Sequence, residues 1–249
     1  MNRKLYLYGV VNATEDKSFG PIGMSTDGPP NEILLKTFEG LGVVFTDKDL
    51  GDEDEIPATR KNLINHQKVI EAVMVDHTIL PFSFGTAVDT EQQIVDVINE
   101  RRDEFVSTIE KIDGKVELSL KIMWEKMDAV FANILEENIQ VRAKKDYLAA
   151  NNIQDQNEKI ELGRLVEEAL VEKKEDMIDI VIDKLQPLAL DMKVQKNITE
   201  AMFANVAFFV SKSEEAQFDQ AVNELSEHEL LKDNTIFKYV GPIAPFNFI

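Results

Sequence analysis

The stretch of residues 78–89, TILPFSFGTAVD, constrains the fold most tightly. It is uncharged before its final Asp and rich in β-forming residues, yet Pro81 and Gly85 rule out a long helix or strand. Amphipathic helix patterns flank it at about 60–77 and 91–113. We therefore expect a short buried strand that turns sharply at Gly85, because glycine permits a positive φ. Proline lacks a backbone donor, so Pro81 should lie at a strand end or sheet edge. We predict structural roles for Pro81, Phe82, Gly85 and Thr86.

Residues 115–125 give the clearest strand pattern in the chain. Apolar side chains occupy every second position, namely Val116, Leu118, Leu120, Ile122 and Trp124. Polar or charged residues and one Met fill the positions between them, including Glu117. Such alternation predicts a strand with one buried face and one wet face. Trp124 is therefore predicted to be a structural core residue.

The elements that follow this strand predict the fold of the second half. We expect helices at about 127–138 and 158–186, the second ended by Pro187, because proline cannot continue a helix. Strands are expected at 188–195, 201–211 and 235–240, with a helix at 213–229. The strand at 201–211 is apolar on both faces and is therefore expected to be central in its sheet. In the first of these strands Leu190, Met192 and Val194 should point inward. The order β, α, β, β, α, β, with an added helix, is that of the ferredoxin-like split βαβ arrangement.

The first half predicts a smaller α+β unit. We expect strands at 5–11, 33–38 and 41–46, a loop at 14–31, and the two helices that flank residues 78–89. Gly114 suits the left-handed position after a helix, and a boundary is placed there. The predicted fold is therefore α+β with two domains: a small N-terminal domain at 1–113, and a C-terminal ferredoxin-like domain at 114–249. The second carries a helical insertion at about 127–186.

Charge and composition exclude several classes of function. The 46 acidic and 27 basic residues give a net charge of −19, which disfavours nucleic acid and anionic membrane surfaces as partners. No stretch approaches the about 18 apolar residues of a membrane span, and the short apolar run at the N-terminus does not resemble a signal peptide. Cysteine is absent, as is common in a reducing compartment. We expect a cytoplasmic protein.

The chain shows no pattern typical of a catalytic or metal site. His66 and His77 share a predicted helix stripe, but eleven residues separate them by roughly 16 Å, so they cannot bind one ion. There is no HExxH, phosphate-binding loop or GxSxG elbow. We therefore expect no metal, no cofactor and no catalytic residue, and we predict a structural, partly buried role for His66.

The C-terminal segment 239–249 carries no charged side chain. Aromatic residues and prolines stand close together in it: Tyr239, Pro242, Pro245, Phe246 and Phe248. A free segment of this composition would expose a large apolar patch to water. It should therefore dock either on its own domain or on a partner protein. These five residues are our candidates for partner contact.

Several motifs occur in one order along the chain: LYLYGVV, Asn65-His66, LPFSFGT, the Gly114, Glu117 and Trp124 pattern, and GPIAPFNF. Together they resemble the gas vesicle protein F and L family, accessory proteins of gas vesicle formation. Two positions depart from the usual family pattern. Gln67 stands where Glu is common, and Ser83 stands where a basic residue is common, so a charge pair between them is not expected here.

The resemblance implies a non-enzymatic accessory protein of gas vesicle assembly, located at the gas vesicle. Its expected partners are the small hydrophobic shell protein and other accessory proteins. The alternative is a small-molecule-binding regulatory module, because ferredoxin-like sheets host many functions. If the C-terminal segment contacts the partner, replacing Phe246 and Phe248 by Ser should weaken binding and leave the melting temperature nearly unchanged. If it plugs its own domain, the effects should be reversed.

Overall fold

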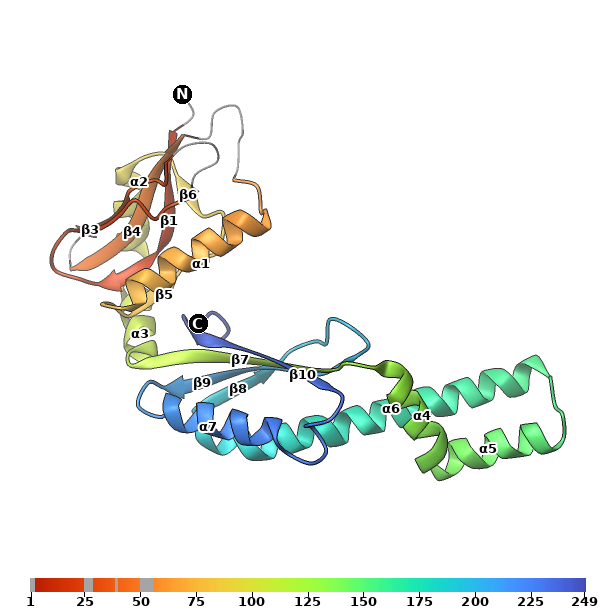
Figure 1. Cartoon of the computed structure of the whole chain (residues 1–249). Coiled ribbons are helices and arrows are strands. Elements are labelled where there is room, and N and C mark those ends of the chain that lie inside the picture. The colour runs from red at the N-terminus through yellow and green to blue at the C-terminus, as the bar shows by residue number, and fades with distance from the viewer. Residues whose placement is uncertain (1–2, 25–28, 39, 50–55) are drawn as a thin grey trace. The chain divides into compact units, whose positions relative to one another are not determined.

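The computed structural model describes residues 3–24, 29–38, 40–49 and 56–249 (Figure 1). The contacts between residues divide the chain into two units. Unit 1 contains Met1–Val116 together with the last residues, Pro242–Ile249, which we call the tail; unit 2 contains Glu117–Gly241. The division after Val116 lies close to the expected boundary at Gly114. The tail, however, belongs with unit 1, whereas 114–249 was expected to form one domain.

Unit 1 is an antiparallel sheet with helices. Its strands follow the order β2-β3-β4-β1-β5, and β6 also pairs with β1. The strands are β1 (Arg3–Asn12), β2 (Lys17–Gly20), β3 (Ile33–Phe38), β4 (Leu41–Asp49), β5 (Ile79–Pro81) and β6 (Ala87–Val88). The helices are α1 (Arg60–Met74), α2 (Glu91–Glu100) and α3 (Arg102–Ile112). The strand β2 lies within the region expected to be a loop, so that expectation was wrong at 17–20.

The central strand β1 is buried on both faces. Tyr6 and Tyr8 point into a core that includes Val69, Ile70 and Val73 of α1. Helix α3 also packs on β1, and its Phe105, Ile109 and Ile112 are buried. At Gly9 the strand β5 comes so close that an added Cβ would lie 2.5 Å from the Leu80 carbonyl oxygen. Glycine is thus the residue that lets the two strands pair at this point.

Residues 78–89 form the short strand and turn that the sequence predicted. β5 ends at Pro81 and lies at the edge of the sheet, where it pairs with Gly9–Val11 of β1. The chain then turns at Gly85, whose φ of +93° lies in the region that favours glycine. Ala87 and Val88 return to β1 as β6. One stretch therefore pairs with the central strand twice.

The helices of unit 1 differ from the expectation in two details. The pattern at 91–113 is divided into α2 and α3 at Arg101, whose φ and ψ are −114° and 19°. Thr90 followed by Gln93 three residues later is a capping-box sequence, which predicts the start of a helix, and α2 has the reciprocal hydrogen bonds of this motif. The spacing of apolar residues in α1 predicts a buried stripe of Leu63, His66, Ile70, Val73 and His77. His66, Ile70 and Val73 are buried, whereas Leu63 is 45 % exposed and Val69 is buried although it was not part of the predicted stripe.

Unit 2 is a four-stranded sheet in the order β10-β7-β9-β8 with helices on one side (Figure 1). The strands are β7 (Lys115–Trp124), β8 (Asp191–Val194), β9 (Met202–Ser211) and β10 (Thr235–Ile243). The helices are α4 (Met127–Glu137), α5 (Ile139–Ala150), α6 (Gln156–Leu185) and α7 (Glu215–Ser226), with a 3-10 turn η1 at Gln186–Leu188. The four strands and the helices α4, α6 and α7 lie near their predicted positions, whereas α5 falls in a region that was not expected to be a regular helix.

The strands β7 and β9 form the core of unit 2. Every residue of β9 except Ser211 is buried, as its apolar character on both faces predicted. Trp124 is 5 % exposed, and its ring centroid lies 5.0 Å from that of Phe203. Glu117 was placed on the wet face of β7 but is only 2 % exposed. Alternation therefore located the strand correctly and assigned the exposure of Glu117 wrongly, because the second face is also covered there.

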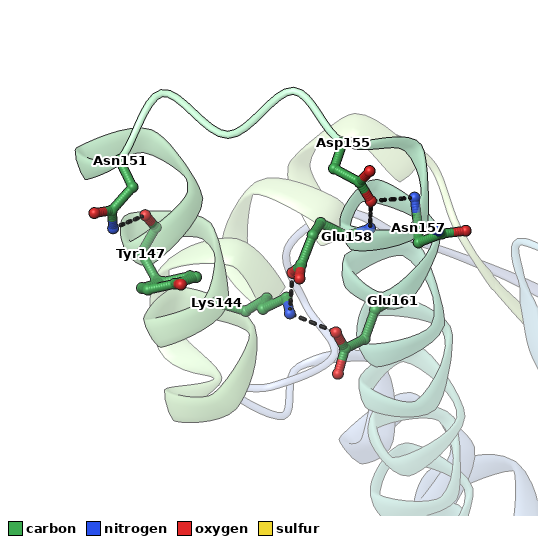
Figure 2. Close-up of polar contacts among 7 residues, drawn as sticks. All are labelled: Lys144, Tyr147, Asn151, Asp155, Asn157, Glu158 and Glu161. Carbon is green, nitrogen blue, oxygen red and sulfur yellow. Dashed lines mark hydrogen bonds and ion pairs between the residues drawn. The ribbon is translucent and has the colours of Figure 1, made fainter.

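The helices α4, α5 and the first half of α6 form an arm that extends beyond the sheet of unit 2 (Figure 1). Figure 2 shows how its far end is fastened. Lys144 of α5 forms ion pairs with Glu158, at 2.6 Å, and with Glu161 of α6. The Asp155 carboxylate accepts hydrogen bonds from the backbone of Asn157 and Glu158 and so caps α6. Polar contacts therefore fasten the end of the arm.

Candidate functional site

The tail occupies a place in the hydrophobic core of unit 1. Ala244 is fully buried within the core cluster that contains Tyr6 and Tyr8, and Phe246 packs against this cluster as a partly buried residue. Phe248 is 4 % exposed. Of the five candidate contact residues, Pro245, Phe246 and Phe248 thus lie in or against the interior of unit 1. A partner could reach the side chain of Phe248 only after the tail had left this position.

Polar bonds hold the tail in the same place. The Lys111 ammonium of α3 donates a hydrogen bond of 2.7 Å to the backbone oxygen of Phe248. Within the tail, the Phe248 N–H donates to the Pro245 oxygen at 2.9 Å. Lys111 was not singled out in the sequence, because nothing near it along the chain indicates a contact 137 residues away. Buried apolar side chains and a hydrogen bond from a lysine are together the arrangement expected of a segment that docks on, and completes, the core of unit 1.

The other two candidate contact residues lie elsewhere. Tyr239 is part of β10 in unit 2, where its ring stacks on Phe218 of α7 and its hydroxyl donates to Asp219 at 2.6 Å. Burial, with the nearby Asp219 carboxylate, raises the pKa of Tyr239. Pro242 is exposed at the start of the tail. The structure therefore does not bring all five candidates together into one surface.

A buried polar network lies in the same core and joins three of the residues predicted to be structural. The Tyr6 hydroxyl oxygen is 2.9 Å from His66 Nδ1, and the same hydroxyl oxygen accepts a hydrogen bond of 3.1 Å from the Gly85 N–H. The second ring nitrogen, His66 Nε2, is 3.3 Å from the backbone oxygen of Phe82. The network thus fastens the Phe82–Gly85 turn to β1 and α1.

The partners fix the tautomer of His66. A carbonyl oxygen can only accept, so Nε2 carries the hydrogen and donates to Phe82, and Nδ1 accepts from the Tyr6 hydroxyl. Burial lowers the pKa of His66, which favours this neutral ring. Burial also raises the pKa of Tyr6 to about 12, so its hydroxyl remains a donor. Both ring nitrogens are used to hold the fold together.

Aromatic rings enclose this network. The rings of Tyr8 and His66 stack with centroids 5.2 Å apart, and Tyr6 and Phe84 meet the His66 ring edge to face. Tyr6 and Tyr8 were not among the residues predicted to belong to this site. Their alternate positions in a predicted strand place both rings on one face, and this signal could have identified them.

The remaining predicted structural residues complete the turn. Pro81 ends β5, and the Phe82 ring meets Phe105 of α3 edge to face at 6.1 Å. The Thr86 hydroxyl donates to the Ser83 backbone oxygen at 2.7 Å. Gln67, one of the two departures from the family pattern, donates to Glu71 on its own helix. Residues 81–86 and His66 therefore form one structural group.

A separate polar cleft of about 580 Å³ opens in unit 1. It is lined by Asn12, Ala13, Thr14, Glu15, Asp16, Lys17, Leu35, Asp76 and His77. Lys17 forms an ion pair with Asp76, and Asp16 accepts two 2.8 Å hydrogen bonds from Thr37, which lower the pKa of Asp16. Three of its charged groups thus already hold elements of unit 1 together.

In the described ranges 3–24, 29–38, 40–49 and 56–249, no three His, Cys, Asp or Glu residues gather in a way that could hold a metal ion. No helix within those same ranges is long and apolar enough to cross a membrane.

Comparison with known proteins gives matches over nearly the whole chain. Gas vesicle protein F of Dolichospermum flosaquae is 26 % identical over 100 % of this chain and 98 % of its own length. Gas vesicle protein F1 of Halobacterium salinarum is 22 % identical over 100 % of this chain and 94 % of its own. These relatives share no more than about a quarter of their residues with this chain, but they align with it from end to end.

Solved structures show the same fold. The crystal structure of gas vesicle protein GvpF from Anabaena sp. PCC7120 has a TM-score of 0.83 at 24 % identity and covers 99 % of this chain and 98 % of that chain. GvpF from Microcystis aeruginosa has a TM-score of 0.76 at 25 % identity, covering 98 % of each chain. The model of the family described as "Gas vesicle synthesis protein GvpL/GvpF" matches residues 4–249. The chain therefore belongs to the GvpL/GvpF family of gas vesicle synthesis proteins.

Proposed function

We propose that this protein is a non-enzymatic accessory factor that binds the hydrophobic shell protein during gas vesicle assembly in the cytoplasm. The family match over residues 4–249 is the observation that carries the proposal. A shell subunit must expose apolar surface before it assembles, and water penalises such exposure by about 25 cal/mol per Å². A carrier with a net charge of −19 can cover that surface and keep the complex dissolved.

The non-enzymatic part of the proposal rests on how the ionisable groups are used. His66 is the one deeply buried histidine among the described residues, and both of its ring nitrogens are hydrogen-bonded within the core. A general base needs a nitrogen that can reach a substrate. Native mass spectrometry of the purified protein is expected to show neither zinc nor a nucleotide. Stoichiometric binding of either would contradict this part of the proposal.

The tail is the segment that we propose for contact with the shell protein. Contact through Phe246 and Phe248 requires the tail to leave the core of unit 1, where Phe248 is 4 % exposed. Release would uncover both the apolar side chains of the tail and the part of the core that they covered. Contact with the apolar surface of a shell subunit would remove these side chains from water again and so offset the free-energy cost of release. Tyr239, Pro242 and Pro245 would flank the released contact.

Binding must be separated from loss of stability in the test. The variant with Phe246→Ser and Phe248→Ser is compared with Trp124→Ala, which removes a buried ring from unit 2 and leaves the tail intact. Both are used in a pull-down with the shell protein at a temperature where circular dichroism shows that they are folded. The tail proposal predicts lost binding only in the first variant. Equal binding by the two variants contradicts a tail contact, and no binding by the wild type contradicts the proposed partner.

The fold of unit 2 supports a further proposal about architecture. We propose that this unit is a ferredoxin-like domain, since its strand order, β10-β7-β9-β8, is that of a split βαβ sheet with crossovers through α6 and α7. The arm of α4, α5 and the first half of α6 is then an insertion in the first crossover. Expression of residues 117–241 alone tests whether the unit folds independently. A chain that shows no cooperative unfolding would contradict the proposal.

The alternative function, a small-molecule-binding regulatory module, would use the polar cleft of unit 1. Its charged residues Lys17, Asp76 and Asp16 already have partners within the protein. We therefore favour the accessory role. A thermal-shift screen with a metabolite panel distinguishes the two functions, because a ligand that binds the native state raises the melting temperature. A gas vesicle defect after gene deletion, with no metabolite response, is the result expected for the accessory role.

A further inference from the structure

The strand β8 presents a free edge with apolar side chains. It ends the sheet of unit 2 and pairs on one side with β9, in the register Asp191 to Phe209 and Val194 to Val206. Leu190, just before the strand, is 59 % exposed, and Val194 is 54 % exposed. The sequence pattern had placed both inside, but at an edge strand only one neighbour is present to cover them. An exposed apolar edge is a template for pairing with another strand.

The hydrogen bonds of β8 show which backbone groups face outward. The Gln195 N–H donates to the Asn205 oxygen at 2.7 Å, so Asp191, Lys193 and Gln195 direct their backbone groups toward β9. Leu190, just before the strand, departs from this alternation, because its N–H also turns toward β9 and donates to the Phe209 oxygen at 2.8 Å. The backbone groups of Met192 and Val194 consequently point to the free edge. The Met192 N–H is held by the carboxylate of its neighbour Asp191 at 2.8 Å. This local bond can be exchanged for one to an incoming strand.

We propose that the free edge of β8 pairs with β8 of a second copy of this chain. The two strands run antiparallel about a two-fold axis at Met192, so that the outward backbone groups of the two Met192 residues face each other. The Leu190 side chain of one copy then lies opposite Val194 of the other as an apolar contact, while the Leu190 N–H stays bonded to Phe209 of its own sheet. Asp191 lies opposite Lys193. The sheet of unit 2 continues across the axis into the sheet of the second copy. This proposal does not depend on the proposed function.

Charge selects this register over its neighbours. Sliding one strand along the other by two residues again places outward backbone groups opposite each other, whereas sliding it by one residue does not. The nearest symmetric alternatives therefore place the axis at Asp191 or at Lys193. The first brings two aspartates together and the second brings two lysines together. Like charges directly opposite each other destabilise a strand pair, whereas opposite charges stabilise it. The register at Met192 alone among these three joins opposite charges and apolar side chains.

The association is expected to be weak and concentration-dependent. The edge is short, since β8 spans Asp191–Val194, and each copy carries a net charge of −19. Long-range repulsion between copies opposes the pairing, and salt screens it over about 8 Å at physiological ionic strength. The pairing is therefore expected only at high protein concentration. Covalent trapping is the appropriate first measurement.

The absence of cysteine makes trapping specific. Met192→Cys introduces one thiol per chain, and residues facing each other in a hydrogen-bonded antiparallel pair have Cα atoms about 5.5 Å apart, within disulfide range. Val194→Cys is the matched control on the same strand, because its two copies would lie four residues, or about 13 Å, apart. Mild oxidation should give a disulfide dimer with Met192→Cys and little with Val194→Cys. Equal cross-linking of the two variants overturns the proposal.

Charge exchange provides an independent test of the register. Asp191→Lys or Lys193→Asp alone places like charges opposite each other on both sides of the axis, and each should weaken association roughly tenfold. The double variant restores opposite charges and should recover the wild-type association constant. Sedimentation equilibrium measures all four proteins at the same salt concentration. A wild type that remains monomeric at the highest concentration, or single variants that associate as it does, overturns the proposal.

Discussion

Truncation of Phe248 provides the most direct test of the tail as part of unit 1. The ring is 4 % exposed and its backbone oxygen accepts from Lys111, so Phe248→Ala removes a buried ring next to a fixed backbone. Loss of burial contributes about 1.5–3 kcal/mol, and the cavity brings the total to about 3–5 kcal/mol. This is a large part of the about 5–15 kcal/mol that stabilises an ordinary domain.

The measurement combines urea unfolding with amide exchange. Ile249→Ala is the matched control, because the neighbouring side chain is 45 % exposed and should change the free energy of unfolding by only about 0.5 kcal/mol. In Phe248→Ala, peptides from β1 of unit 1 should lose protection, while peptides from β9 of unit 2 should keep it. Equal effects of the two substitutions, or loss of protection confined to β9, would refute the reasoning.

Three further predictions concern the cores and the buried histidine. Trp124→Ala should lower the free energy of unfolding of unit 2 by about 3–5 kcal/mol, since its ring is 5 % exposed; urea unfolding like that of the wild type would contradict the core assignment. Gly9→Ala should destabilise unit 1 measurably in a thermal melt, because the new Cβ would lie 2.5 Å from the Leu80 oxygen; an unchanged melting temperature would contradict the close approach. Burial lowers the folded-state pKa of His66 below its ordinary 6.5, so the unfolded chain binds the proton more readily, and stability should fall as pH drops from 6.5 toward the folded value. Urea unfolding at several pH values measures how the free energy of unfolding changes with pH, and His66→Gln should lack the fall below pH 6.5 that His66 causes. The same pH dependence in the two proteins would contradict this prediction.

The sequence alone determined the elements whose signals are local. Alternation located β7, continuous apolar character located β9, and Pro187 closely marked the end of α6. Thr90 and Gln93 predicted the cap of α2, and the composition of residues 78–89 predicted a short strand and a turn at Gly85. Each of these features depends on side chains a few residues apart, which is the range over which periodicity and capping act.

Only the tertiary structure decided which surfaces these elements cover. The tail was known to need an apolar site, but its place in the core of unit 1 depends on a contact between Lys111 and Phe248, 137 residues apart. The bond between Tyr6 and His66 spans 60 residues. Glu117 is buried and Val194 is exposed, against their patterns, because a strand's neighbours determine how many of its faces are covered. Periodicity reports the faces of an element, whereas burial depends on what the rest of the chain places against them.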